Sequence, residues 1–404
     1  MSPRRRSKAP TLRNLHTRRP KVEIFATVIE QGTIDQAKAL ASLPFVYPHV
    51  ALMPDAHVGM GSAVGTVFGT IDAVIPAAVG VDIGCGMIGV RTTFTAADLE
   101  GRDLTKLRDA IEASIPLSPG NYNDWALAGT TADVRTRELS ALAEATGVDL
   151  SHSPKWRQQL GSLGGGNHFI ELCLDEEDTV WMFLHSGSRG VGNKIAQQHI
   201  RAAQEHCAKH WIRLPNADLA YLVAGTPEFD SYLADLAWAQ RFAWLNREEM
   251  MDRFRVALAD FLGAEVVEQE RINCHHNYTV KEDHYGRNVW VTRKGAVRAA
   301  EGDSALIPGS MGTASYVVDG RGYPPSLDSA PHGAGRRLSR TQARAAYTAE
   351  DLAERMTGIV YRPGDAWVDE IPDAYKDIDQ VMVDAEPLVT VRHRLRQVLN
   401  VKGT

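Results

Sequence analysis

Cysteine is scarce in this sequence, with four residues in a chain of 404. They are Cys85, Cys173, Cys207 and Cys274. Their scattered positions match neither the dense spacing of a disulfide-stapled secreted domain nor the paired spacing of a structural zinc site. We therefore expect free thiols and a cytoplasmic location, where thiols stay reduced.

Long apolar runs are also missing. No stretch of 18 or more apolar residues occurs, and the N-terminus lacks the apolar core of a signal peptide, so we expect neither membrane insertion nor export. The phosphate-binding pattern G-x-x-x-x-G-K-[ST] is absent, and no glycine-rich stretch forms the strand, G-x-G-x-x-G and helix unit of a dinucleotide-binding domain. If a nucleotide binds, it therefore uses a different kind of site.

Acidic residues are absent from the first 21 residues, which contain eight lysines and arginines. These are Arg4, Arg5, Arg6, Lys8, Arg13, Arg18, Arg19 and Lys21. Removing these eight positive charges from the total of −6 leaves −14, so charge is strongly segregated along the chain. Two interpretations of this basic arm stay open: it follows a phosphate backbone, or it is a disordered solubilising tail.

The rest of the chain has globular composition, with 44% hydrophobic and 23% charged residues overall. Apolar periodicity and short apolar runs predict several elements. These are helices at 193–211 and 229–261 and buried strands at 180–184 and 289–292. Residues 93–159 are predicted to be peripheral helix and loop. No repeat or linker marks a boundary, so we expect one intertwined, mixed α+β domain over residues 22–404.

Glycine is gathered in segments that also carry an acid, a thiol or an imidazole. Five such segments are MPDAHVGMGSAVG (53–65), GVDIGCGM (80–87), GSLGGGNHFIEL (161–172), HSGSRGVG (185–192) and INCHHNY (272–278). Glycine lets the backbone approach a ligand closely, at a cost of about 0.5–1 kcal/mol in a regular element. The segments are predicted to lie at strand ends and in loops, where rigid scaffolds present functional groups, so together they predict a site.

Five side chains from these segments form a candidate set of metal ligands. They are Asp82, Cys85, His168, His185 and His276. Carboxylate suits hard ions such as Mn²⁺, imidazole suits the middle of the series, and thiolate suits softer ions. Two ions that share a bridging thiolate would use all five. For any single residue the alternative is a buried structural role, but their joint occurrence in glycine-rich loops favours the metal site.

Two further segments carry groups suited to nucleotide chemistry. HGAGR places His332 beside two glycines, and an imidazole with open surroundings is a competent nucleophile at neutral pH. A loop histidine ahead of a basic helix accounts for this segment equally well. In IPGSMGTASYV, residues 307–317, Ser310 and Ser315 with backbone N–H groups provide donors for a phosphate or a base edge, although the pattern alone is weak.

Nine motifs in this order resemble the RtcB family of RNA-splicing ligases. They are VGVDIGCGM, GGGNHFIE, HSGSRG, NCHHN, RKGA, IPGSMG, HGAGR, AYKDID and the terminal VKG. The likeness extends from about Met53 to Gly403, and so many ordered motifs make chance similarity negligible. The resemblance implies the RtcB-type fold, a mixed α+β domain with a central pocket for metal and nucleotide.

The resemblance also assigns roles by position. It implies two Mn²⁺ ions, one held by Asp82, Cys85 and His168 and the other by Cys85, His185 and His276. It implies that His332 is the catalytic nucleophile, which GTP guanylylates. The implied guanylate-binding set is Asn167, His168, Phe169, Ile170, Glu171, His276, Pro308, Gly309, Ser310, Met311, Ser315, His332, Gly333, Ala334, Gly335 and Lys402, and Tyr375 is expected to line the guanine pocket.

The implied reaction joins an RNA 2′,3′-cyclic phosphate or 3′-phosphate end to a 5′-hydroxyl end, in tRNA splicing or RNA repair. Guanylate passes from GTP to histidine and then to the RNA 3′-phosphate, and the 5′-hydroxyl finally displaces GMP. The alternative is a metal-dependent RNA phosphodiesterase or cyclic-phosphate hydrolase, which needs neither His332 nor Lys402. RNA is thus the expected partner. Whether an accessory protein activates the enzyme stays open. We expect a monomer.

Two positions depart from the family pattern. Met60 stands where many members carry a lysine in H-x-G-K-G, and Pro331 precedes the histidine where others often carry a polar residue or cysteine. Neither position belongs to the implied metal or nucleophile set. Both departures leave the identity of the RNA substrate open.

Overall fold

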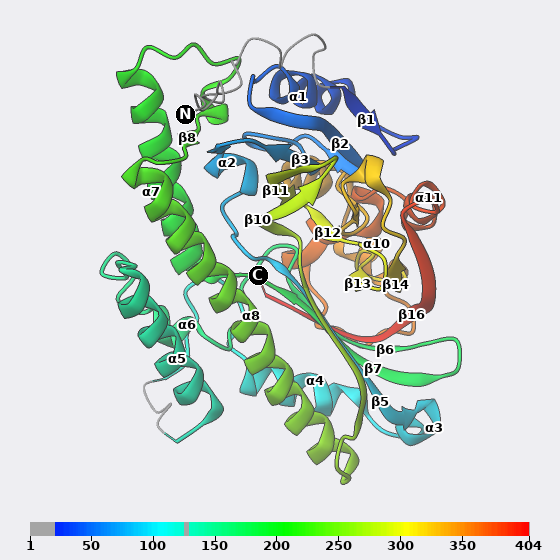
Figure 1. Ribbon diagram of the computed structural model, residues 1–404. Coiled ribbons are helices and arrows are strands. Elements are labelled where there is room, and N and C mark those ends of the chain that lie inside the picture. The colour runs from blue at the N-terminus through cyan, green and yellow to red at the C-terminus, as the bar shows by residue number, and fades with distance from the viewer. Residues whose placement is uncertain (1–20, 125–128, 404) are drawn as a thin grey trace, which may run out of the picture.

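The computed structural model describes residues 21–124 and 129–403, and β-sheets lie at its centre (Figure 1). The larger sheet has seven strands in the order β13-β14-β16-β6-β7-β5-β9, with antiparallel neighbours throughout. They are β5 (Gly86–Thr95), β6 (Phe169–Leu174), β7 (Thr179–Ser186), β9 (Glu268–His275), β13 (Ser304–Ile307), β14 (Ser315–Gly320) and β16 (Val389–Lys402). Segments far apart in the sequence therefore meet in one sheet.

A second sheet has five strands in the order β1-β2-β3-β11-β10. They are β1 (Val22–Ile24), β2 (Val46–His57), β3 (Val64–Thr70), β10 (Asn277–His284) and β11 (Arg287–Lys294). β1 pairs in parallel with β2, and the other pairs are antiparallel. Two small ladders join β4 (Ala73–Val74) to β8 (Leu222–Val223) and β12 (Ala296–Arg298) to β15 (Ser329–Pro331). The chain passes from the large sheet to the second sheet at His276, between β9 and β10.

Helices surround the sheets (Figure 1). The α-helices are α1 (Gln31–Ala41), α2 (Pro76–Val79), α3 (Ala96–Leu99), α4 (Leu104–Ser114), α5 (Thr131–Thr146), α6 (Trp156–Gln159), α7 (Arg189–Lys209), α8 (Pro227–Leu262), α9 (Arg340–Ala346), α10 (Ala349–Arg355) and α11 (Ile378–Asp384). Short 3₁₀ turns are η2 (Ala217–Leu219), η3 (Pro324–Ser326), η4 (Asp365–Glu370) and η5 (Pro372–Ala374).

The longest helix, α8, has clear local start and stop signals. The Thr226 hydroxyl accepts a hydrogen bond from the backbone N–H of Phe229, and Pro227 occupies the first helical position. Gly263 ends the helix in the left-handed conformation, with φ of 71°. α8 runs diagonally across one side of the molecule and packs against α7, β5, β7 and β9 (Figure 1). It therefore supports the strands that carry the site.

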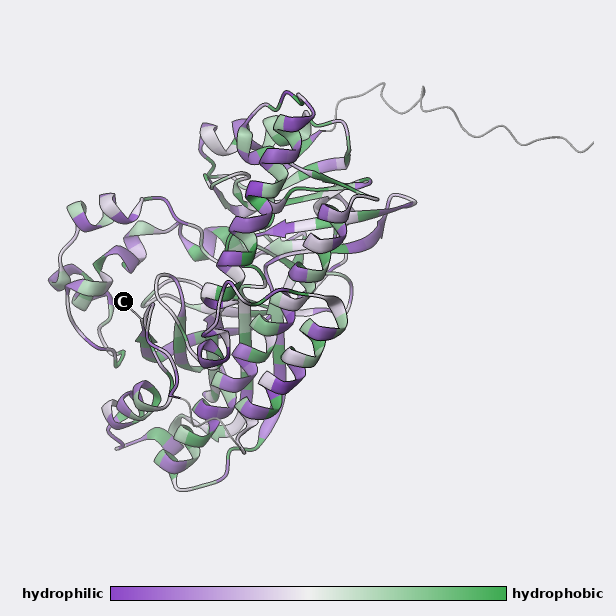
Figure 2. Ribbon diagram, turned by 90° about the vertical axis from the view of Figure 1, so that its left-hand side faces the viewer, coloured by the Kyte–Doolittle hydropathy of each residue, from purple (hydrophilic) through white to green (hydrophobic). Residues whose placement is uncertain are grey.

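The hydrophobic core lies on both faces of the large sheet. All eight residues of β7 are buried, and its side chains alternate between two hydrophobic clusters. Trp181 and Phe183 belong to one cluster, and Val180, Met182 and Leu184 belong to the other. Figure 2 shows hydrophilic and hydrophobic residues alternating along the helices, as expected where one helix face packs on the interior. The sheet is thus a rigid, two-sided frame.

The predicted helices at 193–211 and 229–261 are confirmed as α7 and α8. α7 begins earlier than predicted, at Arg189, because part of the glycine-rich segment HSGSRGVG forms its first turn. Gly192 is needed there for packing, since a β-carbon on it would lie 1.8 Å from the Ser188 hydroxyl oxygen. Gly192 belongs to a segment predicted to be a loop, but in the structure it allows a close contact in the first turn of a helix.

The strands predicted at 180–184 and 289–292 are confirmed as β7 and β11, and residues 93–159 contain only short or peripheral helices in the part that is described. The four cysteines are free. Among the described residues no helix has the length and apolar character needed to cross a bilayer. The basic arm lies outside the described residues apart from Lys21, so its boundary with the domain stays a prediction.

Candidate active site

Strand pairing brings the predicted metal ligands together at one end of the large sheet. Gly86, the first residue of β5, pairs with Ser186 of β7 and with His275 of β9, and Phe169, the first residue of β6, pairs with His185. The ligands therefore lie in or next to four neighbouring strands. The strand register brings together residues that are far apart in sequence. Asp82 and His276, for example, are 194 positions apart.

The ligand atoms converge within hydrogen-bonding distances of one another. The Cys85 sulfur lies 3.4 Å from Nε2 of His168 and 3.3 Å from Nε2 of His185. Nε2 of His168 lies 3.1 Å from Oδ2 of Asp82, and Nε2 of His185 lies 2.8 Å from Nε2 of His276. Cys85 thus lies between two groups of ligands, one with Asp82 and His168 and one with His185 and His276.

The orientation of each imidazole is fixed by its other nitrogen. Nδ1 of His168 donates to the Leu163 carbonyl at 2.9 Å, and Nδ1 of His185 donates to the Asn167 carbonyl at 3.2 Å. Nδ1 of His276 lies 3.2 Å from Oδ1 of the Asn277 side chain. That oxygen also accepts from a backbone N–H, so Nδ1 is the donor here as well. In all three rings Nδ1 is bonded to the surrounding protein and Nε2 faces the cluster, which is the arrangement of metal-binding histidines.

The protonation states also suit metal binding. Burial alone raises the pKa of Asp82, but its hydrogen bond to His168 and the charge of Arg189 lower that pKa to about 2, so the carboxylate is ionised. Burial and the neighbouring charge of Asp82 raise the pKa of the Cys85 thiol. Burial lowers the pKa of both His185 and His276 well below the usual value, so these rings are neutral ligands.

Two glycines are required where the backbone is crowded around these ligands. A β-carbon on Gly86 would lie 2.0 Å from the Cys274 carbonyl oxygen, so glycine allows β5 to pack against β9 directly after Cys85. A β-carbon on Gly187 would lie 2.2 Å from Oδ1 of Asp82. Gly187 therefore lets the Asp82 carboxylate enter the cluster, where it also accepts the Ser188 backbone N–H at 3.0 Å.

His332 lies directly against this cluster. Its ring is 4.6 Å from that of His276, measured between centroids. Its Nδ1 donates to Oδ2 of Asp55 at 2.6 Å, and its backbone N–H donates to the same oxygen at 3.1 Å. Asp55 is fully buried in β2. The nucleophile predicted from HGAGR is thus held by a buried carboxylate that the sequence reasoning did not single out.

A cavity of about 310 Å³ opens beside the cluster and His332. Most of the implied guanylate-binding residues line it. These are Asn167, Phe169, Glu171, His276, Pro308, Gly309, Ser310, Met311, His332, Gly333, Ala334, Gly335 and Lys402. Asp82, Cys85, His185 and Tyr375 line it too. One continuous cavity therefore joins the metal ligands, the histidine and the implied nucleotide pocket.

Three members of the implied set do not line this cavity. The Ile170 side chain points to the other face of β6 and packs in a core cluster with Leu172 and Leu184. Ser315 begins β14, and its hydroxyl accepts the Gly309 backbone N–H at 3.3 Å. Ser315 thus supports the glycine-rich loop from behind. His168 does not line the cavity either, but it belongs to the metal cluster.

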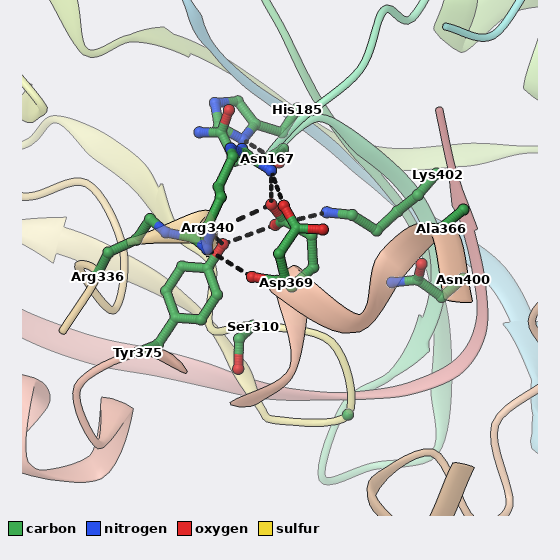
Figure 3. Close-up of polar contacts among 12 residues, drawn as sticks. Asn167, His185, Ser310, Arg336, Arg340, Ala366, Asp369, Tyr375, Asn400 and Lys402 are labelled. Carbon is green, nitrogen blue, oxygen red and sulfur yellow. Dashed lines mark hydrogen bonds and ion pairs between the residues drawn. The ribbon is translucent and has the colours of Figure 1, made fainter. Parts of the chain in front are cut away.

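A buried carboxylate, Glu370, organises the far wall of the cavity, and Figure 3 shows Arg340, Tyr375 and Lys402 on this wall. Glu370 accepts from Lys402 at 3.2 Å, from the Tyr375 hydroxyl at 2.6 Å, and from Arg336 and Arg340 at 3.2 and 2.6 Å. Burial alone raises the pKa of Glu370, but Lys402 and the two arginines lower it, so it is ionised. Lys402 is only 8% exposed, so it is not the solvated terminal lysine that its position alone suggests.

The two departures from the family pattern lie at the edge of this site. The Met60 side chain is 61% exposed, and its carbonyl accepts from the Lys294 ammonium group. Lys294 also donates to the Ser62 carbonyl at 3.0 Å and the Ala77 carbonyl at 3.3 Å. The loop that carries Met60 is therefore held by a lysine from the RKGA motif. Pro331 is buried in β15, opposite Ala296 of β12.

A buried cluster of carboxylate, thiol and imidazole groups, next to a histidine that bonds a buried carboxylate, defines a metal-dependent enzyme. A family model described as tRNA-splicing ligase RtcB matches residues 36–403. RNA-splicing ligase RtcB of Escherichia coli K12 is 45% identical over 390 residues, which cover 93% of this chain and 95% of that protein. The chain belongs to the RtcB family and is an RNA ligase, as the motifs predicted.

More distant relatives carry similar names. tRNA-splicing ligase RtcB of Pyrobaculum aerophilum is 32% identical over 434 residues, covering 90% of this chain and 89% of that protein. RNA-splicing ligase RtcB of Mycobacterium tuberculosis is 32% identical over 413 residues, covering 86% and 94%. The similarity therefore spans the catalytic part of the chain in bacterial and archaeal proteins.

Proposed function

We propose that this ligase joins RNA ends through a guanylate carried on His332, with GTP as co-substrate and two Mn²⁺ ions in the ligand cluster. The observation that carries the proposal is the position of His332. It is bound to the buried Asp55 on one side, lies against His276 on the other, and faces a cavity with room for a nucleotide. The alternative, a metal-dependent hydrolase, needs the ligand cluster but not a nucleophilic histidine facing a nucleotide-sized cavity.

The hydrogen bond to Asp55 determines which nitrogen reacts. Because Nδ1 donates its proton to Asp55, Nε2 of His332 keeps its lone pair. Nε2 attacks the α-phosphorus of GTP, a phosphorus–nitrogen bond forms, the bond to the bridging oxygen breaks, and pyrophosphate leaves. Asp55 stabilises the positive charge that develops on the imidazole during the attack, as a buried carboxylate does in other catalytic pairs.

The ligand set fits two Mn²⁺ ions that share Cys85. Asp82, Cys85 and His168 would hold one ion, and Cys85, His185 and His276 would hold the other. Two Nε2 lone pairs only 2.8 Å apart, on His185 and His276, repel unless a cation lies near both. Bound divalent ions would neutralise phosphate charge and orient the reacting groups. The mixture of oxygen, nitrogen and sulfur ligands suits Mn²⁺ and also admits Zn²⁺.

The second and third steps use the same cavity. The RNA 3′-phosphate, produced where necessary by opening a 2′,3′-cyclic phosphate, attacks the guanylate phosphorus and His332 leaves. The 5′-hydroxyl of the second RNA end then attacks the activated 3′-phosphate, and GMP leaves. Lys402, Glu171 and the loop Pro308–Met311 would hold the guanylate through these steps. The products are one phosphodiester bond, GMP and pyrophosphate.

The proposal is tested by incubating the protein with GTP and Mn²⁺ and measuring its intact mass. A mass increase of one GMP per chain is the expected result. The same preparation should join an RNA that ends in a 2′,3′-cyclic phosphate to an RNA with a 5′-hydroxyl. Protein that contains metal but forms no adduct would contradict the guanylate mechanism and favour a hydrolytic role for the site.

Asp55→Asn tests the partner of the nucleophile. The amide still accepts a hydrogen bond from Nδ1 of His332, but it carries no charge to stabilise the imidazolium. We expect guanylylation to slow by about 100-fold or more, up to the ~10⁴-fold loss seen when the carboxylate partner of a catalytic histidine becomes an amide. The rate of adduct formation and the metal content measure this together. An unchanged rate, or a loss of metal that explains the slower reaction, would remove Asp55 from the mechanism.

Metal affinity should depend on pH through Cys85. Burial and the charge of Asp82 raise the thiol pKa in the metal-free protein, so binding must release its proton, whereas His185 and His276 are already neutral. Raising the pH makes that release easier, so we expect Mn²⁺ affinity to rise about tenfold per unit between pH 6.5 and 8. Calorimetry in buffers of different ionisation enthalpy should show one proton released. A pH-independent affinity would contradict thiolate ligation.

A further inference from the structure

Asn400 presents an unsatisfied acceptor in the cavity. It lies on β16 two residues before Lys402, and both side chains extend from the strand toward the same side (Figure 3). It lines the cavity and is only 2% exposed. Its oxygen, Oδ1, is buried and has no hydrogen-bond partner among the described residues. Burying an unpaired acceptor is unfavourable by about 1–3 kcal/mol, so this oxygen requires a partner from outside the chain.

The neighbours of Asn400 fix which end of its amide is free. The Gln397 side-chain nitrogen donates to the carbonyls of Ser310 and Thr313 at 2.9 and 2.8 Å, so the Gln397 oxygen is an acceptor. The Asn400 nitrogen donates to that oxygen at 3.2 Å and to Oε1 of Glu171 at 2.8 Å. Both amide hydrogens of Asn400 are therefore used. A flipped amide would place its oxygen against two acceptors.

Glu171 supplies a second acceptor beside Asn400 when it is ionised: burial raises its pKa to about 8, and N–H donors on a bound ligand would favour the carboxylate form. Its Oε1 accepts from Asn400, whereas its Oε2 has only the Cys173 sulfur at 3.8 Å, a weak donor. Glu370, on the far wall, is different because it already accepts from four donors. Glu171 and Asn400 thus form a pair of adjacent, buried acceptors. A ligand that satisfies both must present two N–H donors side by side.

The guanine base has such an edge, formed by N1–H and the 2-amino group. Adenine presents an acceptor, N1, next to its single amino group, so it would leave one protein acceptor unpaired. We propose that Asn400 determines base specificity by accepting a hydrogen bond from the guanine 2-amino group while Glu171 accepts from N1–H. This inference rests on the guanylate mechanism proposed above and adds a residue that the RtcB motifs did not indicate.

Inosine triphosphate isolates the contact, because its base retains N1–H and lacks the 2-amino group. The experiment measures the rate at which each nucleotide forms its monophosphate adduct, by intact mass, in the wild type and in Asn400→Leu. We expect the wild type to prefer GTP over inosine triphosphate by about tenfold or more. In Asn400→Leu the rate of adduct formation should fall for GTP and change little for inosine triphosphate. The ratio of the two rates should therefore approach one.

Gln397→Leu is the matched control. It removes the other partner of the Asn400 amide and loosens the Ser310–Thr313 loop, but it removes no atom that faces the base. Adduct formation should slow for both nucleotides, and the preference for GTP should remain. Asn400→Asp keeps an oxygen at the position of Oδ1 and serves if Asn400→Leu does not fold. It should retain the preference even though charge beside Glu171 slows both reactions.

The outcomes separate the two proposals. A wild-type preference that Asn400→Leu leaves intact, or a preference that Asn400→Asp loses, overturns the role of Asn400 alone. A wild type that uses both nucleotides equally overturns it as well. If the metal-loaded wild type forms no adduct with either nucleotide, the guanylate mechanism itself fails and the inference about Asn400 falls with it.

Discussion

A His332→Ala variant is expected to form no guanylate adduct and to join no RNA ends. Nε2 of this ring is the only atom that forms the bond to guanylate in the proposed mechanism, and alanine leaves nothing in its place. Removing the nucleophile of a covalent enzyme lowers turnover by at least about 10³-fold. Intact mass after incubation with GTP and Mn²⁺, together with RNA ligation, measures the effect.

The chain offers a matched control for this variant. His199 is also buried and also bonds a carboxylate, with Nε2 2.6 Å from Asp235, but it lies between α7 and α8 away from the cavity. His199→Ala should still form the adduct. Metal content should be the same in His332→Ala as in the wild type, because His332 is not among the ligands. An adduct on His332→Ala would show that another residue is the nucleophile.

Cys85→Ala is expected to have the second large effect, the loss of both metal sites. The Cys85 sulfur lies 3.4 Å from Nε2 of His168 and 3.3 Å from Nε2 of His185, so it contacts both groups of ligands. Without it each ion would retain only two protein ligands. We expect bound Mn²⁺ to fall from two ions per chain to less than one, and ligation to fall by about 100-fold or more. Elemental analysis of the purified protein gives the metal content.

Cys207→Ala controls for the loss of a buried thiol. Its sulfur lies 3.7 Å from the Tyr221 carbonyl, in the cluster under α7, so its removal should affect packing but not metal content. A Cys85→Ala protein that keeps two ions would refute the shared ligand. One retained ion would assign Cys85 to a single site.

The residues proposed to carry the chemistry were predictable because their types are unusual in glycine-rich segments. Asp82, Cys85, His185 and His332 were each indicated by local sequence, and the structure brings them together. Asp55 was not indicated, although it lies within the segment MPDAH. Its role depends on β2 passing beside the end of β15, a contact that no local pattern reveals.

Gly192 and Lys402 also show that local sequence does not reveal contacts between distant segments. Gly192 suggested a loop and instead allows a tight turn at the start of α7. Lys402 alone suggested a solvated lysine, and only its pairing with Glu370, 32 positions away, makes it part of the cavity. Asn400 has no sequence signal at all, because an asparagine in a strand is informative only once its amide partners are known. Local sequence patterns therefore predicted the candidate ligands. The residues that hold them in place became visible only from contacts between distant segments.

The position of β16 has a consequence for how the protein is made on the ribosome. β16 lies between β14 and β6, so before it is synthesised the large sheet exists as two separate parts with open edges. The same strand delivers Asn400 and Lys402 to the cavity. Chains fold progressively during translation, and unpaired edges are prone to associate with other chains. A nascent chain therefore completes its seven-stranded sheet and the cavity wall that carries Asn400 and Lys402 in one step, after β16 has been synthesised.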